Sequence, residues 1–294
     1  MADCSPSSRC GKSAACSGCS SAPQPLETAK SRALRKTLGG IRNTLFVMSG
    51  KGGVGKSAVT VNLAAALANA GLRVGSLDVD MHGPSVPSLL GIDAHLAPRD
   101  EEVLVPAYYR EKIAVVSMDS LLADRDTAII WRGPKKTAAI NQFLTSVAWG
   151  NLDVLLVDSP PGTGDEHLAV LQAIPDARCI MVTTPQEISL ADVRKALHFL
   201  ERIKADLMGL VENMSGLSCP HCGGSIDIFS SGGGEALAKA RGIPFFGRIP
   251  IDPAMLVAAD ARCPLVDMDG DFPSKEAFIN IALNVKKRLF SEEK

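Results

Sequence analysis

The sequence has no long hydrophobic run and no excess of charge of either sign. No apolar stretch in its 294 residues approaches the roughly 18 residues that a membrane-spanning helix needs. The formal net charge of −1 argues against a protein that binds nucleic acid by neutralising phosphates. The first residues, MADCSPSSRCGK, contain no hydrophobic segment of the kind found in signal peptides. We therefore expect a cytoplasmic protein that engages neither a membrane nor nucleic acid.

Eight cysteines need an explanation other than disulfide bonds, because cytoplasmic thiols stay reduced. Cys179 belongs to the apolar run CIMVTT and is expected to be a small buried hydrophobic residue, whereas Cys263 shows no sign of a role. The other six are candidate metal ligands. They are Cys4, Cys10, Cys16 and Cys19 near the N-terminus, and the CxxC pair Cys219 and Cys222.

Composition divides the chain at about residue 25. Residues 1–25 are rich in Ser, Ala, Gly, Pro and Cys and show no periodicity, which predicts a flexible tail that is ordered only if its thiols bind something. Residues 26–294 alternate apolar runs with helical patterns and contain no internal repeat. One α/β domain with a cysteine-bearing tail is the predicted organisation.

Unbroken apolar runs separated by helices predict a mostly parallel sheet with helices on both faces. The expected strands are LFVMS, RVGSLDV, KIAVVSM, LDVLLVD, RCIMVTT, LMGLVENM and PFFGRIP. The main expected helices are SAVTVNLAAALANA, closed by Gly71, then PKKTAAINQFLTSVAW, ISLADVRKALHFLERI and KEAFINIALNVKKRLF. The last helix carries an apolar stripe, which we expect to dock on the sheet rather than anchor the chain to a membrane surface. The stripe is formed by Phe278, Ala282, Val285 and Leu289.

The stretch GKGGVGKS, residues 50–57, satisfies the phosphate-loop pattern between an apolar run and a helical pattern. Glycines allow backbone N–H groups to surround phosphate oxygens, and the helix N-terminus adds partial positive charge. We expect Lys56 to contact the β- and γ-phosphates and the Ser57 hydroxyl to bind Mg²⁺. The candidate ATP-binding residues are Gly50, Lys51, Gly52, Gly53, Val54, Gly55, Lys56 and Ser57.

Carboxylates follow two of the apolar runs, at the strand ends where open α/β sheets bind ligands. Asp158, in LLVDSPPGTGDEH, is a candidate to help hold Mg²⁺. In LDVDMHGPS, Asp78 is a candidate cap for the following helix, and Asp80 is our choice to orient or deprotonate the attacking water. His82 and His167 flank these loops, and we expect hydrogen-bonded loop residues rather than catalysts.

The segment ENMSGLSCPHCGGS places Cys219 and Cys222 at a spacing that can bind one soft metal centre. A [4Fe–4S] cluster or a structural zinc needs four thiolates, and one CPHC supplies two. A symmetric dimer would supply four. A zinc site shared with Cys16 and Cys19, a redox-active pair and unliganded surface thiols are the alternatives, although no strand-to-helix context supports the redox pair.

The lysine after the first glycine of the loop is not required by the general phosphate-loop pattern. With it, GKGGVGKS resembles the deviant Walker A motif of the MinD/ArsA/nitrogenase-iron-protein group of P-loop ATPases. This resemblance implies that Lys51 reaches across a dimer interface to the partner's nucleotide, as an arginine finger does elsewhere. A solvated lysine is the alternative. The catalytic candidates are then Lys51, Lys56 and Asp80.

Six motifs together resemble the Mrp/ApbC iron–sulfur cluster carriers and the eukaryotic cytosolic scaffold ATPases. They are SGKGGVGKS, LDVDMHGPS, WRGPKK, DSPPGTGDEH, ENMSG-x2-CPHC and FFGRIPIDP, across roughly residues 35–290. The resemblance implies a slow ATPase that acts as a homodimer or as a heterodimer with a paralogue. It would bind ATP and Mg²⁺, bridge a labile [4Fe–4S] cluster through Cys219 and Cys222 of both chains, and pass it to apoproteins. It also makes Asn213 an adenine contact.

The N-terminal tail departs from the pattern of the family that the chain resembles. The eukaryotic scaffolds follow an N-terminal CxxC with a fourth cysteine, whereas here Cys16 and Cys19 come last. Four tail thiols still suffice for a second cluster, with zinc or no ligand as alternatives. In WRGPKK, no role for Trp131, Arg132 or Lys135 follows from the sequence beyond packing beside the loops.

The prediction is therefore a cytoplasmic dimeric ATPase that assembles or carries iron–sulfur clusters. A positioning ATPase of the MinD or ParA type would share the lysine-bearing loop but would not need CPHC. A zinc-stabilised P-loop ATPase is the second alternative.

Overall fold

The computed structural model describes residues 29–81, 83–93, 96–98, 103–121, 133–218, 222, 224–226 and 228–291. The predicted tail over residues 1–25, with its four cysteines, lies outside these ranges. Cys219, His82, Trp131 and Arg132 also lie outside them.

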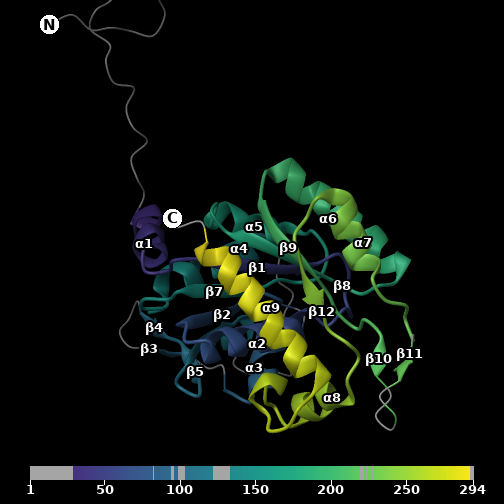
Figure 1. Cartoon of the computed structure of the whole chain (residues 1–294). Coiled ribbons are helices and arrows are strands. Elements are labelled where there is room, and N and C mark those ends of the chain that lie inside the picture. Colours follow the sequence, from purple (N-terminus) through teal and green to yellow (C-terminus); the bar gives the residue numbers. More distant parts are fainter. Residues whose placement is uncertain are drawn as a thin grey trace, which may run out of the picture.

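An eight-stranded sheet forms the centre of the described structure, in the order β12-β9-β8-β1-β7-β2-β6-β5 (Figure 1). Every neighbouring pair in it is parallel except β5 and β6 at one edge. This confirms the predicted mostly parallel sheet. The strands are β1 (Thr44–Ser49), β2 (Val74–Asp78), β5 (Ala107–Tyr109), β6 (Ile113–Ser117), β7 (Val154–Asp158), β8 (Arg178–Thr183), β9 (Asp206–Glu212) and β12 (Phe245–Arg248).

Helices cover both faces of this sheet. One face carries α1 (Ala29–Leu38), α4 (Gly133–Ser146), α5 (Asp165–Ala173), α6 (Glu187–Ile203) and α7 (Gly233–Arg241). The other face carries α2 (Lys56–Asn69), α3 (Val86–Leu90), α8 (Pro253–Asp260) and α9 (Pro273–Phe290). Each face of the sheet has its own hydrophobic core, and β1 contributes side chains to both. Phe46 and Met48 pack against the first group of helices, and Leu45 and Val47 pack against the second. The predicted two-sided covering is confirmed.

Short elements complete the described chain. Two small antiparallel pairs are β3 (Ala97–Pro98) with β4 (Leu104–Val105), and β10 (Leu217–Ser218) with β11 (Ser225–Ile226). Two 3₁₀ turns are η1 (Met118–Leu121) and η2 (Leu265–Asp267). Helix α4 is shorter than predicted, since Trp149 leaves the helix and donates its indole N–H to the Phe143 carbonyl, 3.0 Å away.

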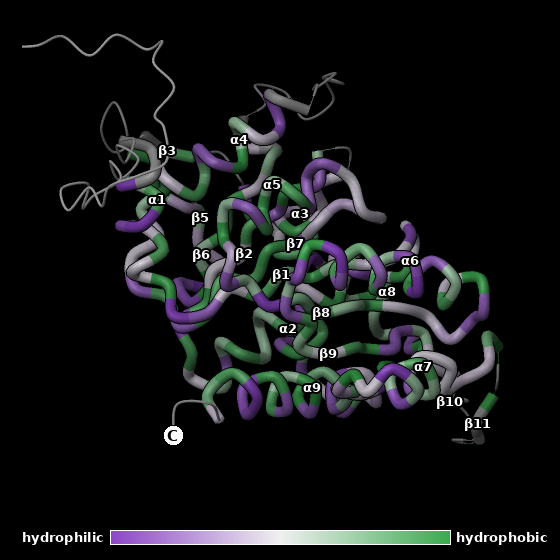
Figure 2. Tube along the Cα trace, turned by 90° about the horizontal axis from the view of Figure 1, so that it is seen from above, coloured by the Kyte–Doolittle hydropathy of each residue, from purple (hydrophilic) through white to green (hydrophobic). Residues whose placement is uncertain are grey.

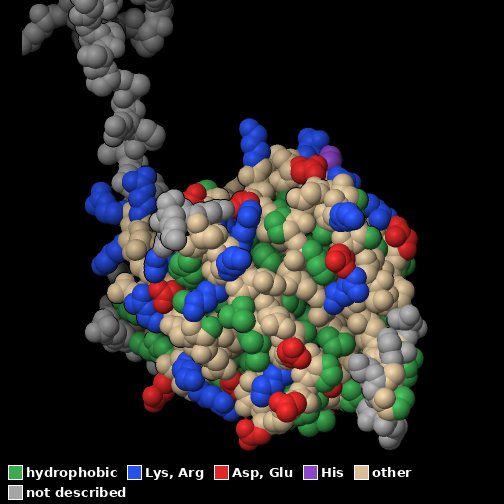
Figure 3. Space-filling view, in the orientation of Figure 1, with side chains coloured by type: hydrophobic (Ala, Val, Ile, Leu, Met, Phe, Trp, Pro, Cys, Tyr) green, Lys and Arg blue, Asp and Glu red, His purple; other side chains and the backbone are tan. Residues whose placement is uncertain are grey.

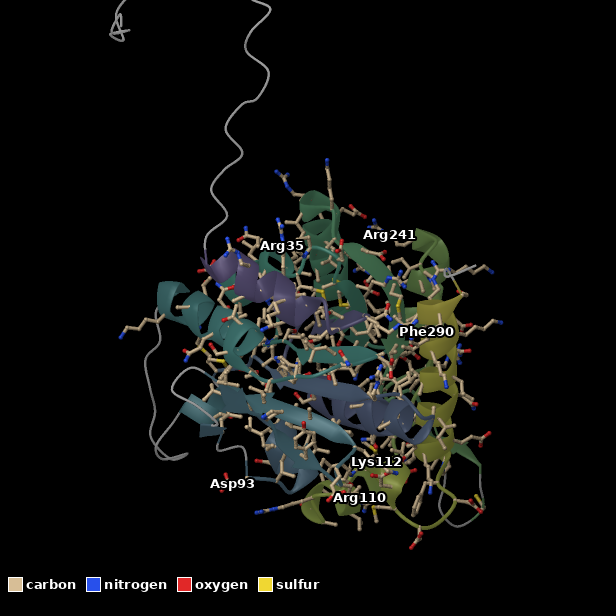
Figure 4. The ribbon with its side chains drawn as sticks, turned by 90° about the vertical axis from the view of Figure 1, so that its left-hand side faces the viewer. Arg35, Asp93, Arg110, Lys112, Arg241 and Phe290 are labelled. Carbon is tan, nitrogen blue, oxygen red and sulfur yellow. The ribbon has the colours of Figure 1, made fainter. Side chains whose placement is uncertain are left out.

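The terminal helix α9 docks on the body of the protein, as predicted. Its stripe of Phe278, Ala282, Val285 and Leu289 is at most 3% exposed and belongs to the core that α2 shares. Figure 2 shows hydrophobic and hydrophilic residues alternating along α9, and Figure 3 shows acidic and basic side chains surrounding the scattered hydrophobic ones on this face. Near the end of α9, the Arg42 guanidinium lies 5.2 Å from the centre of the Phe290 ring (Figure 4). Within the described ranges, every helix is too short or too polar to cross a membrane.

Cys179 fulfils its predicted structural role in β8. Its side chain is fully buried, and burial raises the pKa of its thiol to about 12. The residue therefore remains a neutral thiol in the core and is not a metal ligand.

Replacing Phe278 by Ala should lower the free energy of unfolding by about 3 to 5 kcal/mol, because a fully buried ring leaves a cavity between α9 and α2. Leu283 lies on the same helix but is 52% exposed, so Leu283→Ala should change the free energy by no more than about 0.5 kcal/mol. Urea titration of both variants measures the difference. Equal losses would show that α9 is not held by its stripe.

Candidate nucleotide and thiol site

The phosphate loop joins β1 to α2, where the sequence predicts it. Gly53 and Gly55 adopt left-handed backbone conformations with φ of 81° and 79°, which favour glycine. A Cβ atom on Gly50 would lie 2.6 Å from backbone atoms of Asp192 and Val193 in α6, so that position has no room for a side chain. The left-handed conformations therefore favour glycine at positions 53 and 55, and the contact with α6 requires it at position 50.

Asp158 is the centre of the polar network beneath the loop. Its fully buried carboxylate accepts hydrogen bonds from the Ser57 hydroxyl and the Thr60 hydroxyl, each at 2.6 Å. The Lys56 ammonium lies 2.6 Å from the same carboxylate and donates to Ser57 Oγ at 3.3 Å. The predicted residues Lys56, Ser57 and Asp158 are thus brought together. Thr60 joins them one helical turn after Lys56, which the phosphate-loop pattern does not signal.

Asp78 and Asp80, at the end of β2, have different surroundings. Asp78 is fully buried and accepts backbone N–H groups from Ser85 at 2.9 Å and Val86 at 3.1 Å, at the start of α3. It also accepts the Asp80 N–H at 3.0 Å. Burial, reinforced by the charge of Asp158, raises the pKa of Asp78 to about 8. The candidate capping role of Asp78 is confirmed, and Asp80 faces the cavity.

A cavity of about 410 Å³ opens above the loop. Its lining includes Lys51, Lys56, Ser57 and Asp80, together with Ser49, Gly52, Gly53, Val54, Gly55, Ala58, Ser85, Leu89 and Pro161. This volume is within the range of small-ligand pockets. The backbone N–H groups of the loop, a lysine and oxygen donors are the groups that a nucleotide phosphate and Mg²⁺ require. The residues present therefore fit a magnesium–nucleotide complex.

Lys51 lines this cavity and is partly exposed. The Ser49 hydroxyl donates to the Lys51 carbonyl at 3.0 Å, which orients the backbone at the start of the loop. The ammonium has no ion-pair partner among the residues that the structure describes.

Asn213 connects the phosphate loop to the segment that leads to the cysteines. Its side-chain amide donates to the Val54 carbonyl at 2.8 Å, and a Cβ atom on Gly55 would lie 2.3 Å from that amide nitrogen. Asn213 also donates its own backbone N–H to the Thr183 carbonyl at 2.7 Å. Its predicted contact with adenine remains a prediction, but its contact with the loop is direct.

Of the CPHC segment, the structure describes Cys222, which lies in the chain between β10 and β11, the two strands at the lower right of Figure 1. Cys222 is exposed and carries a free thiol, whereas Cys219 lies outside the described residues. Leu217 of β10 forms a parallel bridge with Ile251, which fixes the base of the hairpin beside the start of α8. Exposed apolar side chains of Ile226, Ile228 and Phe229 lie on the following stretch of the chain.

Two side chains beside the loop after Asp158 have roles that the sequence does not reveal. His167 is fully buried at the start of α5, accepts the Gly164 N–H at 3.2 Å, and meets the Phe46 ring edge-on. It is therefore a core histidine within α5, and the expectation of a hydrogen-bonded loop residue is wrong. Lys136, in the WRGPKK motif, lies 2.5 Å from Glu166 and so links α4 to α5 beside this loop.

A parallel sheet whose β1 ends in a lysine-bearing phosphate loop defines a P-loop nucleoside triphosphatase. A family model described as ParA: NUBPL iron-transfer P-loop NTPase matches residues 40–286. The chain belongs to this family.

Relatives of known name cover most of the chain. An iron–sulfur cluster carrier protein of Methanococcus maripaludis is 44% identical over 97% of this chain and 98% of its own length. The cytosolic Fe-S cluster assembly factor NUBP2 of Homo sapiens is 43% identical over 86% of this chain and 94% of its own length.

Solved structures share the fold. A nucleotide-binding protein of Archaeoglobus fulgidus in complex with ADP superimposes with a TM-score of 0.70 and 37% identity over 83% of this chain and 98% of that one. The septum site-determining protein MinD of Pyrococcus horikoshii has a TM-score of 0.61 at 21% identity over 85% of this chain and 98% of that one, which shows a common fold.

The burial of His167 has a consequence for stability at acid pH. Burial, assisted by the charge of Lys56 and opposed by Glu166, lowers the pKa of His167 from 6.5 to about 4. The unfolded chain therefore binds a proton between these pH values and the folded chain does not. The stability contributed by this residue is present above pH 6.5 and lost as the pH falls to about 4, a loss on the order of 3 kcal/mol.

His167→Asn keeps an acceptor for the Gly164 N–H but does not titrate. The difference in unfolding free energy between wild type and variant should therefore shrink as the pH falls from 6.5 to 4. Denaturant titrations at several pH values measure it. Parallel pH profiles for the two proteins would contradict the low pKa.

Proposed function

We propose that this protein is a nucleotide-dependent carrier of iron–sulfur clusters. The observation that carries the proposal is the position of Asn213, which bonds the phosphate loop and lies six residues before Cys219 (213 to 219). Nucleotide and thiols therefore share one short segment of chain. Relatives more than 40% identical are named as cluster carriers or assembly factors, whereas MinD is 21% identical, which favours a carrier over a positioning ATPase.

The residues of the cavity would hold ATP and Mg²⁺ as follows. The backbone of residues 50–57 and Lys56 would bind phosphate oxygens, and Ser57 and Asp158 would supply oxygen ligands on the Mg²⁺ side. The bound metal would offset negative charge on the phosphates. Asp80 lines the same cavity and would orient or deprotonate the attacking water in a slow hydrolysis.

A dimer would complete both centres. Lys51 lines its own cavity and is partly exposed, and it would reach from there to the nucleotide of a second chain. Cys219 and Cys222 supply two thiolates, so two chains would supply the four that a [4Fe–4S] cargo requires. The partner would be a second copy or a paralogue, and the recipients would be apo iron–sulfur proteins.

We also propose a location in the cell and a role for the N-terminal cysteines. The human relative is named as a cytosolic factor, which supports a cytoplasmic location. The tail over residues 1–25 would carry a second cluster on its four thiols. Residues 26–294 would form the ATPase domain.

Lys51→Ala should lower the rate of ATP hydrolysis by about 10³-fold while leaving nucleotide affinity nearly unchanged, because the lysine would act on the nucleotide of the partner. Lys112, which lies before β6 at the opposite edge of the parallel sheet (Figure 4), provides the matched control Lys112→Ala. Steady-state phosphate release and equilibrium nucleotide binding separate the two effects. Unchanged turnover at saturating ATP would remove Lys51 from catalysis.

Cys222→Ala should abolish the bridging cluster after anaerobic reconstitution, with a loss of about four iron atoms per dimer. Cys263→Ala is the control, because Cys263 lies between α8 and η2 and contacts Tyr109 and Arg110. Iron and sulfide analysis with visible absorption spectra gives the result. Stoichiometric zinc in protein that takes up neither iron nor sulfide would favour a zinc-stabilised ATPase instead.

A further inference from the structure

The cysteine hairpin leaves the body of the protein between β9 and α7 and returns to the same point. The described residues of this excursion, which lies between Gly216 and Ser231, include β10, β11 and Cys222. Its entry is Ser215, and its exit is Gly232, the residue that precedes α7. Both ends contact one side chain, the carboxylate of Glu212.

Glu212 holds the two ends with separate hydrogen bonds. Its Oε1 accepts the Ser215 hydroxyl at the entry and the Gly232 N–H, 2.8 Å away, at the exit. Its Oε2 accepts the Gly234 N–H at 2.5 Å, in the first turn of α7. The Arg248 guanidinium of β12 lies 4.0 Å from Oε1. We call this arrangement, consisting of Glu212, Ser215, Gly232 and Gly234, the hairpin clasp.

The clasp is buried, which makes it costly to open. Glu212 is fully inaccessible to solvent, and a buried carboxylate requires several donors to remain in place. The N-terminus of α7 adds favourable partial charge. A Cβ atom on Gly234 would lie 2.9 Å from Glu212 Oε2, so only glycine allows this close approach. The position of the hairpin base is therefore tightly fixed.

The residue after Glu212 extends the clasp to the phosphate loop. The Asn213 side chain holds the Val54 carbonyl at 2.8 Å. The Ser215 N–H donates to the Ile249 carbonyl at 2.9 Å, and the Ile251 N–H donates to the Gly216 carbonyl at 2.8 Å. Asn213, Met214 and Ser215 are thus the three consecutive residues that join the contact with the phosphate loop at Val54 to the entry of the hairpin.

We propose that Glu212 is a positioning residue that couples the nucleotide loop to the thiols by clasping both ends of the cysteine hairpin. This deepens the proposed function, on which it rests for the binding of nucleotide, and assigns the coupling to a side chain distant from both centres. A nucleotide that tightens the loop changes the exposure of Cys222 through the clasp. Without the clasp, the loop and the hairpin respond independently.

The test measures how fast iodoacetamide alkylates Cys222 in the iron-free full-length protein, with and without magnesium–ATP, by mass spectrometry of the Cys222 peptide. In the wild type, nucleotide should change this rate by at least about 5-fold, the lower end of typical couplings between sites. In Glu212→Gln, the ratio should fall to about one while nucleotide affinity is retained, because an amide NH₂ group cannot accept the N–H groups that a carboxylate oxygen accepts.

Two further variants serve as a control and as a milder disruption of the clasp. Glu235→Gln alters the exposed partner of Arg248 but leaves the clasp intact, and it should keep the wild-type ratio. Ser215→Ala removes one donor and should give an intermediate ratio, and it carries the test if Glu212→Gln does not fold.

A wild-type ratio of one, or an undiminished ratio in both Glu212→Gln and Ser215→Ala, would overturn the proposal. Because alkylation uses no iron, a failure of cluster reconstitution would refute the carrier function and leave this result standing.

Discussion

The structure depends on a buried negative charge at the end of β7. Asp158 is fully inaccessible, and it is stable there because α2 supplies a lysine and two hydroxyl groups within 2.6 Å. Removing the partners of a buried charge typically costs about 3 to 5 kcal/mol. The carboxylate therefore fixes the first turns of α2 against the sheet and, with them, the phosphate loop that precedes α2.

Parallel pairing brings the other functional groups to the same edge of the sheet. Asp78 and Asp158 are direct register partners on β2 and β7, and Glu212 pairs with Thr183 of β8 and with Arg248 of β12. Because parallel strands end at a common edge, the nucleotide loop and the base of the cysteine hairpin lie on one side of the molecule. This geometry explains how one chain can place a nucleotide loop near the hairpin that carries the exposed thiol of Cys222.

The features that follow a local pattern were predictable from the sequence. The phosphate loop, the carboxylates Asp78 and Asp158 at the ends of two strands, and the apolar stripe of α9 each have a short-range signature, and all lie where expected. Roles set by contacts between distant residues were not predictable. Thr60 reaches Asp158 across 98 residues, and Glu212 receives Gly234 across 22. Neither Thr60 nor Glu212 is part of a sequence motif whose spacing would indicate its partner.

The prediction of where helices begin and end was wrong for a related reason. The run that continues α4 to Trp149 has helical periodicity, but Val147 forms a bridge with Leu104 and ends the helix. Helices α5 and α7 were not predicted, because glycine-rich segments precede both and their hydrophobic faces are short. His167 looked like a loop residue, and only its packing on Phe46 shows that it belongs to the core.

The central claim is that the lysine at position 51 and the CPHC thiols both require a second chain. The most direct test is the solution mass of the protein loaded with magnesium–ATP and reconstituted with iron and sulfide. The account predicts twice the mass of one chain, with the cluster and the nucleotide present in the same particle. A monomer that retains both would contradict it.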